Sequence, residues 1–178
     1  MAAGLLASAL GAGCAGGGGG GRAGDPLPDV DLESLDGGAP LRLADVGDGP
    51  VVVNLWATWC GPCRAEMPAF DEVDRALGGK VRVVGVNVGD DPGAARRFVD
   101  DVGVGFPQYL DRDGTVHTEL GATGMPATAF VDDGQVLDLH TGALGAGELR
   151  DRIERQLGVT VPAGPAPAGN RSAPGDDH

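Results

Sequence analysis

Two cysteines separated by two residues, Cys60 and Cys63, are the side chains of this sequence whose type and spacing best suit chemistry. They follow the apolar, β-branched run 51–56, which predicts a strand buried on both faces, and they precede a helical pattern over 62–77. A thiol at the N-terminus of a helix faces free backbone N–H groups and the positive end of the helix dipole, which favour the thiolate. We therefore expect Cys60 to be a nucleophile with a pKa below its ordinary value, and Cys63 to be the resolving thiol that closes a reversible disulfide.

The rest of the sequence alternates between strand and helix patterns. Strand patterns at 30–35 and 41–43 predict an N-terminal hairpin, and further strands are predicted at 81–88, 106–110, 128–131 and 136–140. Helical periodicity predicts helices over 62–77, 92–102 and 148–157. This order predicts one α/β domain, over residues 27–159, in which helices cover a central sheet.

The composition limits the classes of function. A chain of 178 residues with 42% apolar residues can bury one good core, so one compact domain with tails is expected. The net charge is −13, and the 13 Lys and Arg residues are scattered along the chain. Binding of nucleic acid needs clustered positive charge, so this class of partner is not expected.

The first 26 residues predict a targeting signal and a linker rather than part of the folded domain. Residues 1–13 carry a short apolar core followed by small residues, and Cys14 follows them, as is typical of a lipoprotein-type signal peptide cleaved before a lipidated cysteine. No Lys or Arg precedes Cys14, so a leader of Ala and Gly with an unmodified thiol is the alternative. The Gly-rich residues 14–26 predict a flexible tether, and the Pro/Ala/Gly-rich residues 160–178 predict a disordered tail.

Four motifs occur in order along the predicted domain: WCGPC at 59–63, EMP at 66–68, VNVG at 86–89 and GMPAT at 124–128. Together they resemble the thioredoxin superfamily, and more closely its extracytoplasmic TlpA/ResA/DsbE-like branch. The resemblance implies a thioredoxin-like fold, with a central mixed sheet flanked by helices and an N-terminal β-hairpin extension. It also implies a thiol-disulfide oxidoreductase whose redox centre is the Cys60–Cys63 disulfide, with no separate cofactor and no metal.

The resemblance assigns further residues to the site. Met125 and Pro126 match the position of a cis-proline beside the cysteine pair, where the backbone of the preceding residue pairs with the substrate chain. A trans proline that starts a strand is the alternative, since only about 5% of X–Pro bonds are cis in folded proteins. Trp59 would cover the site, with plain packing as its alternative use. Gly61 and Pro62 would shape the turn that a substrate approaches, and this dipeptide resembles that of strongly reducing thioredoxins.

The group that handles protons is assigned through the resemblance alone. Cytoplasmic thioredoxins have a buried Asp six residues before the first cysteine, and this chain has Asn54 there, which cannot titrate. ResA-like proteins have an acidic residue near the cysteines after the VNVG motif; here it is Asp90, which we expect to carry a proton to or from Cys63. N-capping of the helix that begins near Pro92 is the alternative role of this residue. We expect Glu66 to be a solvated charge on the helix face.

Other uses of the cysteine pair are also considered. A thioredoxin-fold copper metallochaperone would use both cysteines and a distant histidine, which would be His117 or His140, although such proteins usually have a wider cysteine spacing. A disulfide-forming oxidase of the same fold would use the same residues at a higher redox potential. A zinc site is not expected, because the histidines show no paired ligand spacing.

The expected partners come from the resemblance. It implies protein disulfide substrates such as apocytochrome c, whose haem-attachment thiols must be free, or a copper-site protein of the respiratory chain. A membrane thiol carrier of the CcdA/DsbD type would supply the electrons. Lipidation at Cys14 would place the protein on the extracytoplasmic face of a bacterial cell membrane.

Overall fold

The computed structural model describes residues 23–162 of the chain. The predicted signal peptide, Cys14, most of the predicted tether and most of the predicted tail lie outside the described residues. Between residues 23 and 162, no helix is both long enough and apolar enough to cross a lipid bilayer.

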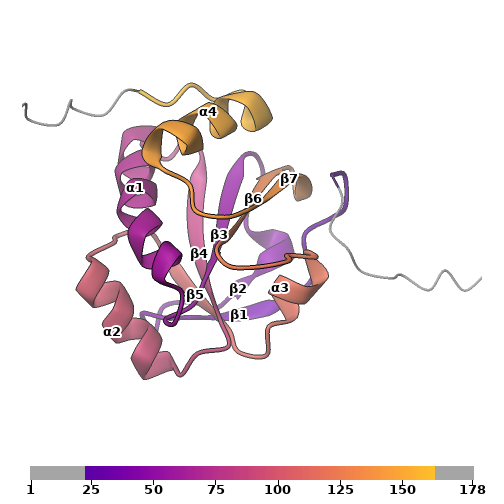
Figure 1. Ribbon diagram of the computed structural model, residues 1–178. Helices are drawn as coiled ribbons and strands as arrows, with labels where there is room; N and C mark the ends of the chain where they lie inside the picture. Colours follow the sequence, from indigo (N-terminus) through magenta and orange to yellow (C-terminus); the bar gives the residue numbers. More distant parts are fainter. Residues whose placement is uncertain (1–22, 163–178) are drawn as a thin grey trace, which may run out of the picture.

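A seven-stranded mixed sheet runs through the described part of the chain (Figure 1). Its strands lie in the order β2-β1-β5-β4-β3-β6-β7. β3, β4 and β5 are parallel, whereas β1 and β6 run antiparallel to the strands they join. This sheet and the hairpin of β1 and β2 confirm the predicted fold class. The strands are β1 Asp31–Ser34, β2 Leu41–Arg42, β3 Val51–Trp56, β4 Arg82–Val88, β5 Gln108–Asp111, β6 Ala127–Asp132 and β7 Gln135–Thr141.

Helices cover both faces of the sheet. Residues of α1, α2 and α4 form one core cluster with one face of the sheet, and residues of α3 and of the 3-10 helix η1 form a second cluster with the other face. The helices are η1 Leu43–Asp45, α1 Gly61–Leu77, α2 Pro92–Val102, α3 Thr115–Glu119 and α4 Ala146–Leu157.

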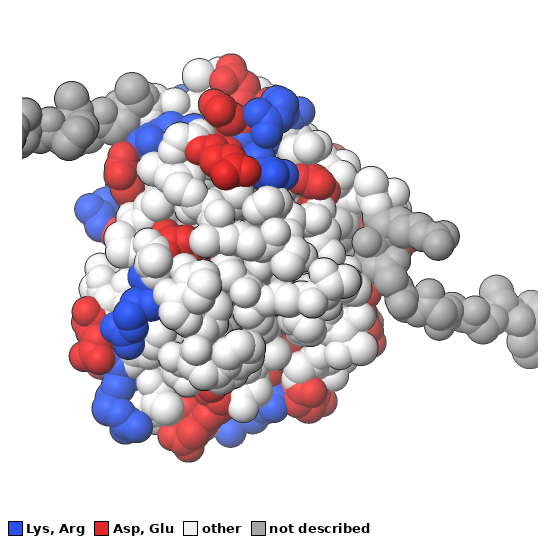
Figure 2. Space-filling view, in the orientation of Figure 1, with Lys and Arg blue, Asp and Glu red and all other residues white. Residues whose placement is uncertain are grey.

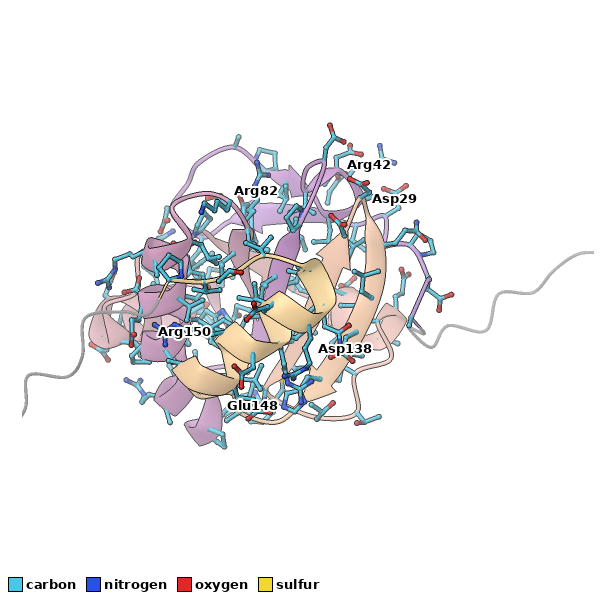
Figure 3. The ribbon with its side chains drawn as sticks, turned by 90° about the horizontal axis from the view of Figure 1, so that it is seen from above. Asp29, Arg42, Arg82, Asp138, Glu148 and Arg150 are labelled. Atoms are coloured by element: carbon cyan, nitrogen blue, oxygen red, sulfur yellow. A yellow bond between two sulfur atoms is a disulfide. The ribbon has the colours of Figure 1, made fainter. Side chains whose placement is uncertain are left out.

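Ion pairs hold α4 to its neighbours. Figure 3, viewed from above, shows α4 crossing over the sheet. Arg150 of α4 contacts Glu72 of α1 at 2.6 Å, and Arg152 contacts Asp138 of β7 at 3.1 Å. The first pair joins α4 to the helix that carries the cysteines, and the second joins it to the edge strand of the sheet.

The strand β3 forms the base of the site. All six of its residues are buried, as its continuous apolar run predicts for a strand covered on both faces. Val52 and Trp56 face the core cluster of α1, α2 and α4. Because side chains alternate along a strand, Asn54 faces the same helices, although it is polar and 0% exposed.

Two boundaries of the domain differ from the prediction. Gly24 and Asp25, assigned to the tether from the sequence, pair with Val136 of β7 through backbone hydrogen bonds of 2.7 and 2.9 Å. Pairing along an open sheet edge uses backbone groups, so the Gly-rich composition did not reveal it. Val161, assigned to the tail, is only 8% exposed and packs in the cluster of α1, α2 and α4.

The short helix α3 has no counterpart among the predicted elements. Asp111, at the end of β5, accepts hydrogen bonds from the backbone N–H groups of Val116 and His117 at 3.1 and 3.4 Å. A helix of five residues is too short to show a hydrophobic period, and the side chain that caps it comes from the preceding strand.

Candidate active site

The Cys60–Cys63 pair lies at the start of α1, shortly after the end of β3. The two residues are disulfide-bonded, with a Cα–Cα distance of 5.3 Å. Cys60 is the N-cap of α1, and its Sγ accepts a hydrogen bond from the backbone N–H of Cys63 at 3.1 Å. Pro62 lies in the first turn, where the backbone N–H that it lacks would have no partner within the helix. The sulfur of Cys60 therefore lies at the positive end of a helix, as the sequence predicts.

Access differs between the residues of the CxxC motif. Cys63 is 0% exposed and Cys60 is 3% exposed. Trp59, directly before Cys60, is 71% exposed, and no other large apolar side chain of residues 23–162 is exposed. Gly61 and Pro62 are also exposed. An incoming group therefore meets the Trp59–Pro62 segment first, and the sulfur of Cys60 before that of Cys63.

Two of the loops near the pair carry no charge. Segments 120–126 and 141–147, which precede β6 and α4, contain no Asp, Glu, Lys or Arg. In Figure 2 the charged side chains lie in the upper, left and lower parts of the view, and its centre is uncharged. This uncharged patch suits contact through apolar and backbone groups.

The Met125–Pro126 peptide bond is cis, as the resemblance implies. Pro126 is buried and directly precedes β6, whose first residue, Ala127, pairs with Leu55 of β3. Met125 is partly buried and packs against the cluster that contains both cysteines. The backbone O of Pro126 accepts a hydrogen bond from Gly142 N–H at 2.9 Å, which joins the two uncharged loops beside the cysteine pair.

Glu66 is buried, so the prediction of a solvated charge on the helix face is wrong. It is 3% exposed. Its Oε1 accepts a hydrogen bond from Nδ2 of Asn54 at 2.8 Å, and its Oε2 accepts one from the backbone N–H of Leu144 at 2.9 Å. The reason is position: Glu66 lies three residues after Cys63 and next to the buried Met67, on the core-facing side of α1. The position of Glu66 on the helix predicts that it is buried, whereas its charge predicts that it is exposed.

Burial raises the pKa of Glu66 to about 7, because an ionised carboxylate is poorly solvated inside the core. The hydrogen bonds from Leu144 and Asn54 oppose this shift, since they favour the ionised form. The carboxyl group therefore changes its protonation state near neutral pH. It lies about one helical turn from Cys63, which suits proton exchange with a thiol.

Asp90 follows β4 and contacts the turn before the cysteines. Its Oδ2 accepts hydrogen bonds from the backbone N–H of Thr58 at 2.6 Å and from Nδ2 of Asn87 at 2.7 Å, and its Oδ1 accepts one from the Thr58 hydroxyl at 2.8 Å. The alternative role of Asp90 as the N-cap of α2 is wrong, because Asp91 is that cap and accepts a hydrogen bond from Ala94 N–H at 3.0 Å. Transfer of protons by Asp90 stays a prediction.

Comparison with known proteins decides the family. The family model described as Redoxin matches residues 22–157. The chain belongs to the Redoxin family. The Thiol:disulfide interchange protein DsbE of Yersinia pestis is 36% identical over 138 residues, which cover 75% of this chain and 69% of that protein. The Thiol-disulfide oxidoreductase ResA of Geobacillus thermodenitrificans is 32% identical over 133 residues, which cover 74% of this chain and 76% of that protein.

A solved structure shows the same fold. The structure of a secreted disulfide oxidoreductase of Mycobacterium tuberculosis matches with a TM-score of 0.64 and 28% identity, covering 71% of this chain and 96% of that one. The Redoxin match spans Cys60 and Cys63, and the two relatives are named as a thiol:disulfide interchange protein and a thiol-disulfide oxidoreductase. This Redoxin-family chain is thus a thiol-disulfide oxidoreductase of the DsbE/ResA type with a thioredoxin-like fold.

The two candidate copper-binding histidines lie on separate elements of this Redoxin-family domain. His117 lies on α3 and His140 on β7. Over the part of the chain that the structure describes, no group of three or more His, Cys, Asp or Glu side chains is arranged to hold a metal ion.

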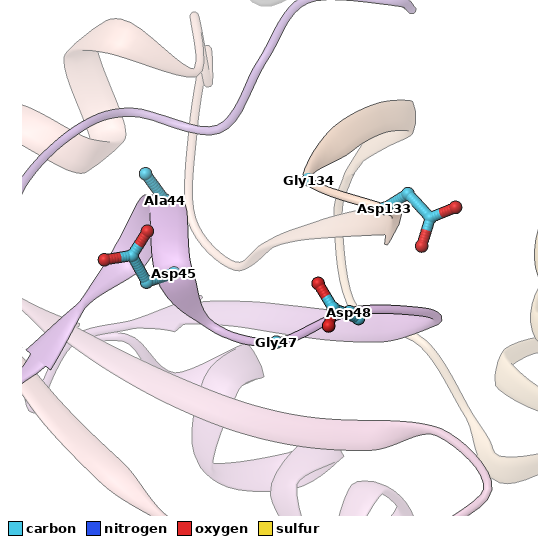
Figure 4. Close-up of a pocket in the computed structure, with 6 residues that line it drawn as sticks. All are labelled: Ala44, Asp45, Gly47, Asp48, Asp133 and Gly134. Atoms are coloured by element: carbon cyan, nitrogen blue, oxygen red, sulfur yellow. The ribbon is translucent and has the colours of Figure 1, made fainter.

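A hollow of about 410 Å³ lies at the other end of β3 (Figure 4). β3 has six residues and a rise of about 3.3 Å per residue, so its first and last Cα atoms are about 17 Å apart. The hollow is therefore separate from the redox site of this Redoxin-family protein. It lies between the loop before β3 and the turn from β6 to β7, and is lined by Ala44, Asp45, Gly47, Asp48, Asp133 and Gly134.

Proposed function

We propose that this protein reduces disulfides of other proteins outside the cytoplasm, with Cys60 as the attacking thiol and Cys63 as the resolving thiol. The observation that carries the proposal is the placement of Cys60, whose Sγ caps α1 and accepts a hydrogen bond from Cys63 N–H. A thiolate at this position gains stability from the helix N-terminus. Cys60 is also the more accessible of the two cysteines, at 3% exposed against 0% for Cys63.

The proposed exchange transfers electrons from the dithiol of the protein to the disulfide of the substrate. The Cys60 thiolate attacks one sulfur of the substrate disulfide, and the other sulfur leaves as a thiolate that takes up a proton. Cys63 then loses its proton and attacks Sγ of Cys60, which releases the second substrate sulfur as a thiolate that is protonated in turn. The substrate ends as a dithiol, and the protein ends with the Cys60–Cys63 disulfide present in this structure.

Glu66 is the proposed acceptor of the Cys63 proton. It lies on the core-facing side of α1 one turn after Cys63, and its pKa of about 7 leaves a large ionised fraction at neutral pH. The hydrogen bonds from Asn54 and Leu144 fix the orientation of the carboxylate. In this proposal a helix supplies the buried acid that cytoplasmic thioredoxins carry on a strand.

The proposed substrates are apocytochrome c or a copper-site protein of the respiratory chain, on the basis of the resemblance. A membrane thiol carrier of the CcdA/DsbD type would reduce the Cys60–Cys63 disulfide again. Lipidation of Cys14 would hold the domain at the extracytoplasmic face of the membrane, and the secreted relative from Mycobacterium tuberculosis supports that compartment. The exposed Trp59 and the backbone of Met125 would contact the substrate chain.

The redox potential of the Cys60/Cys63 couple tests the direction of the reaction. It is measured by equilibrating the protein with dithiothreitol or glutathione buffers and separating the two forms after alkylation. A value near that of thioredoxin, about −270 mV, supports a reductant, whereas a value near that of DsbA, about −120 mV, would support the disulfide-forming oxidase instead.

Two cysteine variants test the order of the steps. Cys63→Ser is expected to accumulate a mixed disulfide between Cys60 and a protein substrate, and Cys60→Ser is expected to form none. Non-reducing gels and mass spectrometry of the trapped species give the result. If Cys63 in the Cys60→Ser variant formed a mixed disulfide as fast as Cys60 does in Cys63→Ser, the assignment of Cys60 as the attacking thiol would be wrong.

A further inference from the structure

Asp90 joins the end of β4 to the turn that precedes the nucleophile. Both hydrogen-bond donors of Thr58, its backbone N–H and its hydroxyl, donate to this one carboxylate, at 2.6 and 2.8 Å. These contacts bridge 32 positions of the sequence. A single side chain therefore fixes the backbone and the side chain of Thr58 together.

Asn87 fixes the carboxylate from the side of the sheet. Its Nδ2 donates to Oδ2 of Asp90 at 2.7 Å. Asn87 is 1% exposed, lies within β4, and is paired with Trp56 of β3 in the parallel register. The orientation of Asp90 is thus set by the centre of the sheet, which is the most constrained part of the fold.

The turn that contains Thr58 also sets the position of Cys60. The backbone N–H of Cys60 donates to the carbonyl O of Ala57 at 3.1 Å, so Thr58 lies inside this turn. Sγ of Cys60 then accepts its hydrogen bond from Cys63 N–H at the start of α1. The stabilising effect of a helix N-terminus on a negative charge is confined to the first turn, so a small displacement of Sγ lowers the thiolate fraction.

We propose that Asp90 is a positioning residue, which holds Thr58 so that the Cys60 thiolate stays at the N-terminus of α1. This role rests on the proposed function of Cys60 as the nucleophile, and it gives Asp90 no proton to carry. It depends on the shape and acceptors of the side chain rather than on its charge. The two roles, positioning and proton transfer, therefore differ in what they predict for an amide at this position.

The variant Asp90→Asn separates the two roles. Its amide oxygen can accept the hydrogen bonds from Thr58 N–H and from Asn87, and its amide nitrogen can donate to the Thr58 hydroxyl oxygen, which is also an acceptor. Positioning is then largely kept while proton transfer is lost. Asp90→Ala removes both acceptor oxygens and with them all three hydrogen bonds, so positioning and proton transfer are both lost.

The test measures how fast iodoacetamide alkylates Cys60 in the reduced full-length protein as a function of pH, with the product quantified by mass spectrometry of the Cys60 peptide. This measurement needs no protein substrate, and its result does not depend on whether the protein acts as a reductant or as an oxidant. At pH 7, Asp90→Ala is expected to slow alkylation about two- to fivefold and to shift the profile to higher pH. Asp90→Asn is expected to stay within about 1.5-fold of the parent, because positioning is kept.

A second pair of variants acts from the other side of the contact. Thr58→Val loses the hydroxyl donor but keeps the shape of the side chain, and Thr58→Ser keeps the donor. We expect slower alkylation of Cys60 in Thr58→Val and a parent-like rate in Thr58→Ser. This pair decides the question if Asp90→Ala does not fold.

The neighbouring carboxylate provides the matched control. Asp91→Ala removes an exposed Asp that caps α2, so it should lower stability without changing the alkylation profile of Cys60. Equal slowing in Asp90→Asn and Asp90→Ala would assign the effect to charge and overturn the inference, as would parent-like rates in Asp90→Ala and Thr58→Val. A parent protein whose Cys60 reacts no faster than an unfolded cysteine would instead refute the proposed nucleophile.

Discussion

Nδ2 of Asn54 donates a 2.8 Å hydrogen bond to Oε1 of Glu66, between β3 and α1. Asn54 is 0% exposed and Glu66 is 3% exposed, so the contact lies inside the core beneath the cysteine pair. Asn54 on β3 is therefore a hydrogen-bond donor that cannot titrate, and the buried acid is Glu66 on α1. Because Glu66 and Cys63 belong to the same helix, their spacing is fixed by the geometry of α1 alone.

The raised pKa of Glu66 predicts how the stability of the protein depends on pH. The ordinary pKa is 4.5 and the folded value is about 7, so the folded state binds the proton more tightly than the unfolded state. Stability is therefore highest below pH 4.5 with respect to this group, falls as the pH rises, and reaches its minimum above pH 7. Glu66→Gln should be more stable than the parent at pH 8 by about 3 kcal/mol relative to their difference at pH 4.5.

Urea unfolding of both proteins across this pH range provides the measurement. Glu66→Gln can keep its contacts, because Oδ1 of Asn54 has no hydrogen-bond partner among residues 23–162. This oxygen can accept from the new amide once the Asn54 side chain turns over. Glu119→Gln, at an exposed carboxylate on α3, controls for the loss of one negative charge. A stability difference between Glu66→Gln and the parent that does not change with pH would contradict the buried, proton-exchanging carboxyl.

The same variant should slow the resolution step. Without the carboxylate, Cys63 must give its proton to water, so release of the mixed disulfide by Glu66→Gln is expected to be about 100-fold slower at pH 7. The first attack, by Cys60, should change much less. Rapid mixing of the reduced protein with a model disulfide separates the two steps, and a parent-like resolution rate would remove Glu66 from the proposed mechanism.

The sequence predicted the main elements because their hydrophobic periods are long. α1 begins at Gly61 and ends at Leu77, within one residue of the expected range, and Met67, Phe70, Val73 and Leu77 are buried as their spacing predicts. The cysteine pair at the helix N-terminus and the cis-proline also lie as expected. These features are local or follow from motifs of fixed spacing.

The missed features depend on contacts between segments far apart in the sequence. The role expected of Glu66 was judged from its charge, yet its partners come from β3 and from the loop before α4. Asp90 and Asp91 are adjacent and chemically identical, and only the path of the chain after β4 decides that Asp91 caps α2 while Asp90 turns to Thr58. No periodicity in the sequence distinguishes such neighbours.

Trp59 should matter for partner binding and not for folding. With 71% of its surface exposed, it contributes little to the core, so Trp59→Ala is expected to change the free energy of unfolding by no more than about 0.5 kcal/mol. Loss of its contact area should raise KM for a protein disulfide several times more than KM for a small disulfide such as oxidised glutathione. Steady-state assays with both substrates test this, and equal changes in the two KM values would argue against a docking role.

Gly85 is predicted to be essential for a buried hydrogen bond near the site. A Cβ atom at this position would lie 1.9 Å from Oε1 of Gln108, and that oxygen accepts a 2.9 Å hydrogen bond from Nε1 of Trp56. Trp56 in turn stacks on Phe98 of α2, with ring centroids 4.8 Å apart. Gly85→Ala must displace the Gln108 side chain and leave the indole N–H without its acceptor, which should cost about 1–3 kcal/mol of stability.

A double-mutant cycle with Gln108→Ala isolates the cause of that loss. Gln108→Ala alone also removes the acceptor of the Trp56 N–H, so in its presence the added methyl group of Gly85→Ala meets no clash and breaks no further hydrogen bond. The double variant should therefore be more stable than the sum of the single effects predicts, by about 1 kcal/mol or more. Urea midpoints give the coupling energy, and near-UV circular dichroism reports the indole environment. Additive single effects would mean that Gly85 acts through backbone freedom rather than through the space it leaves for Gln108.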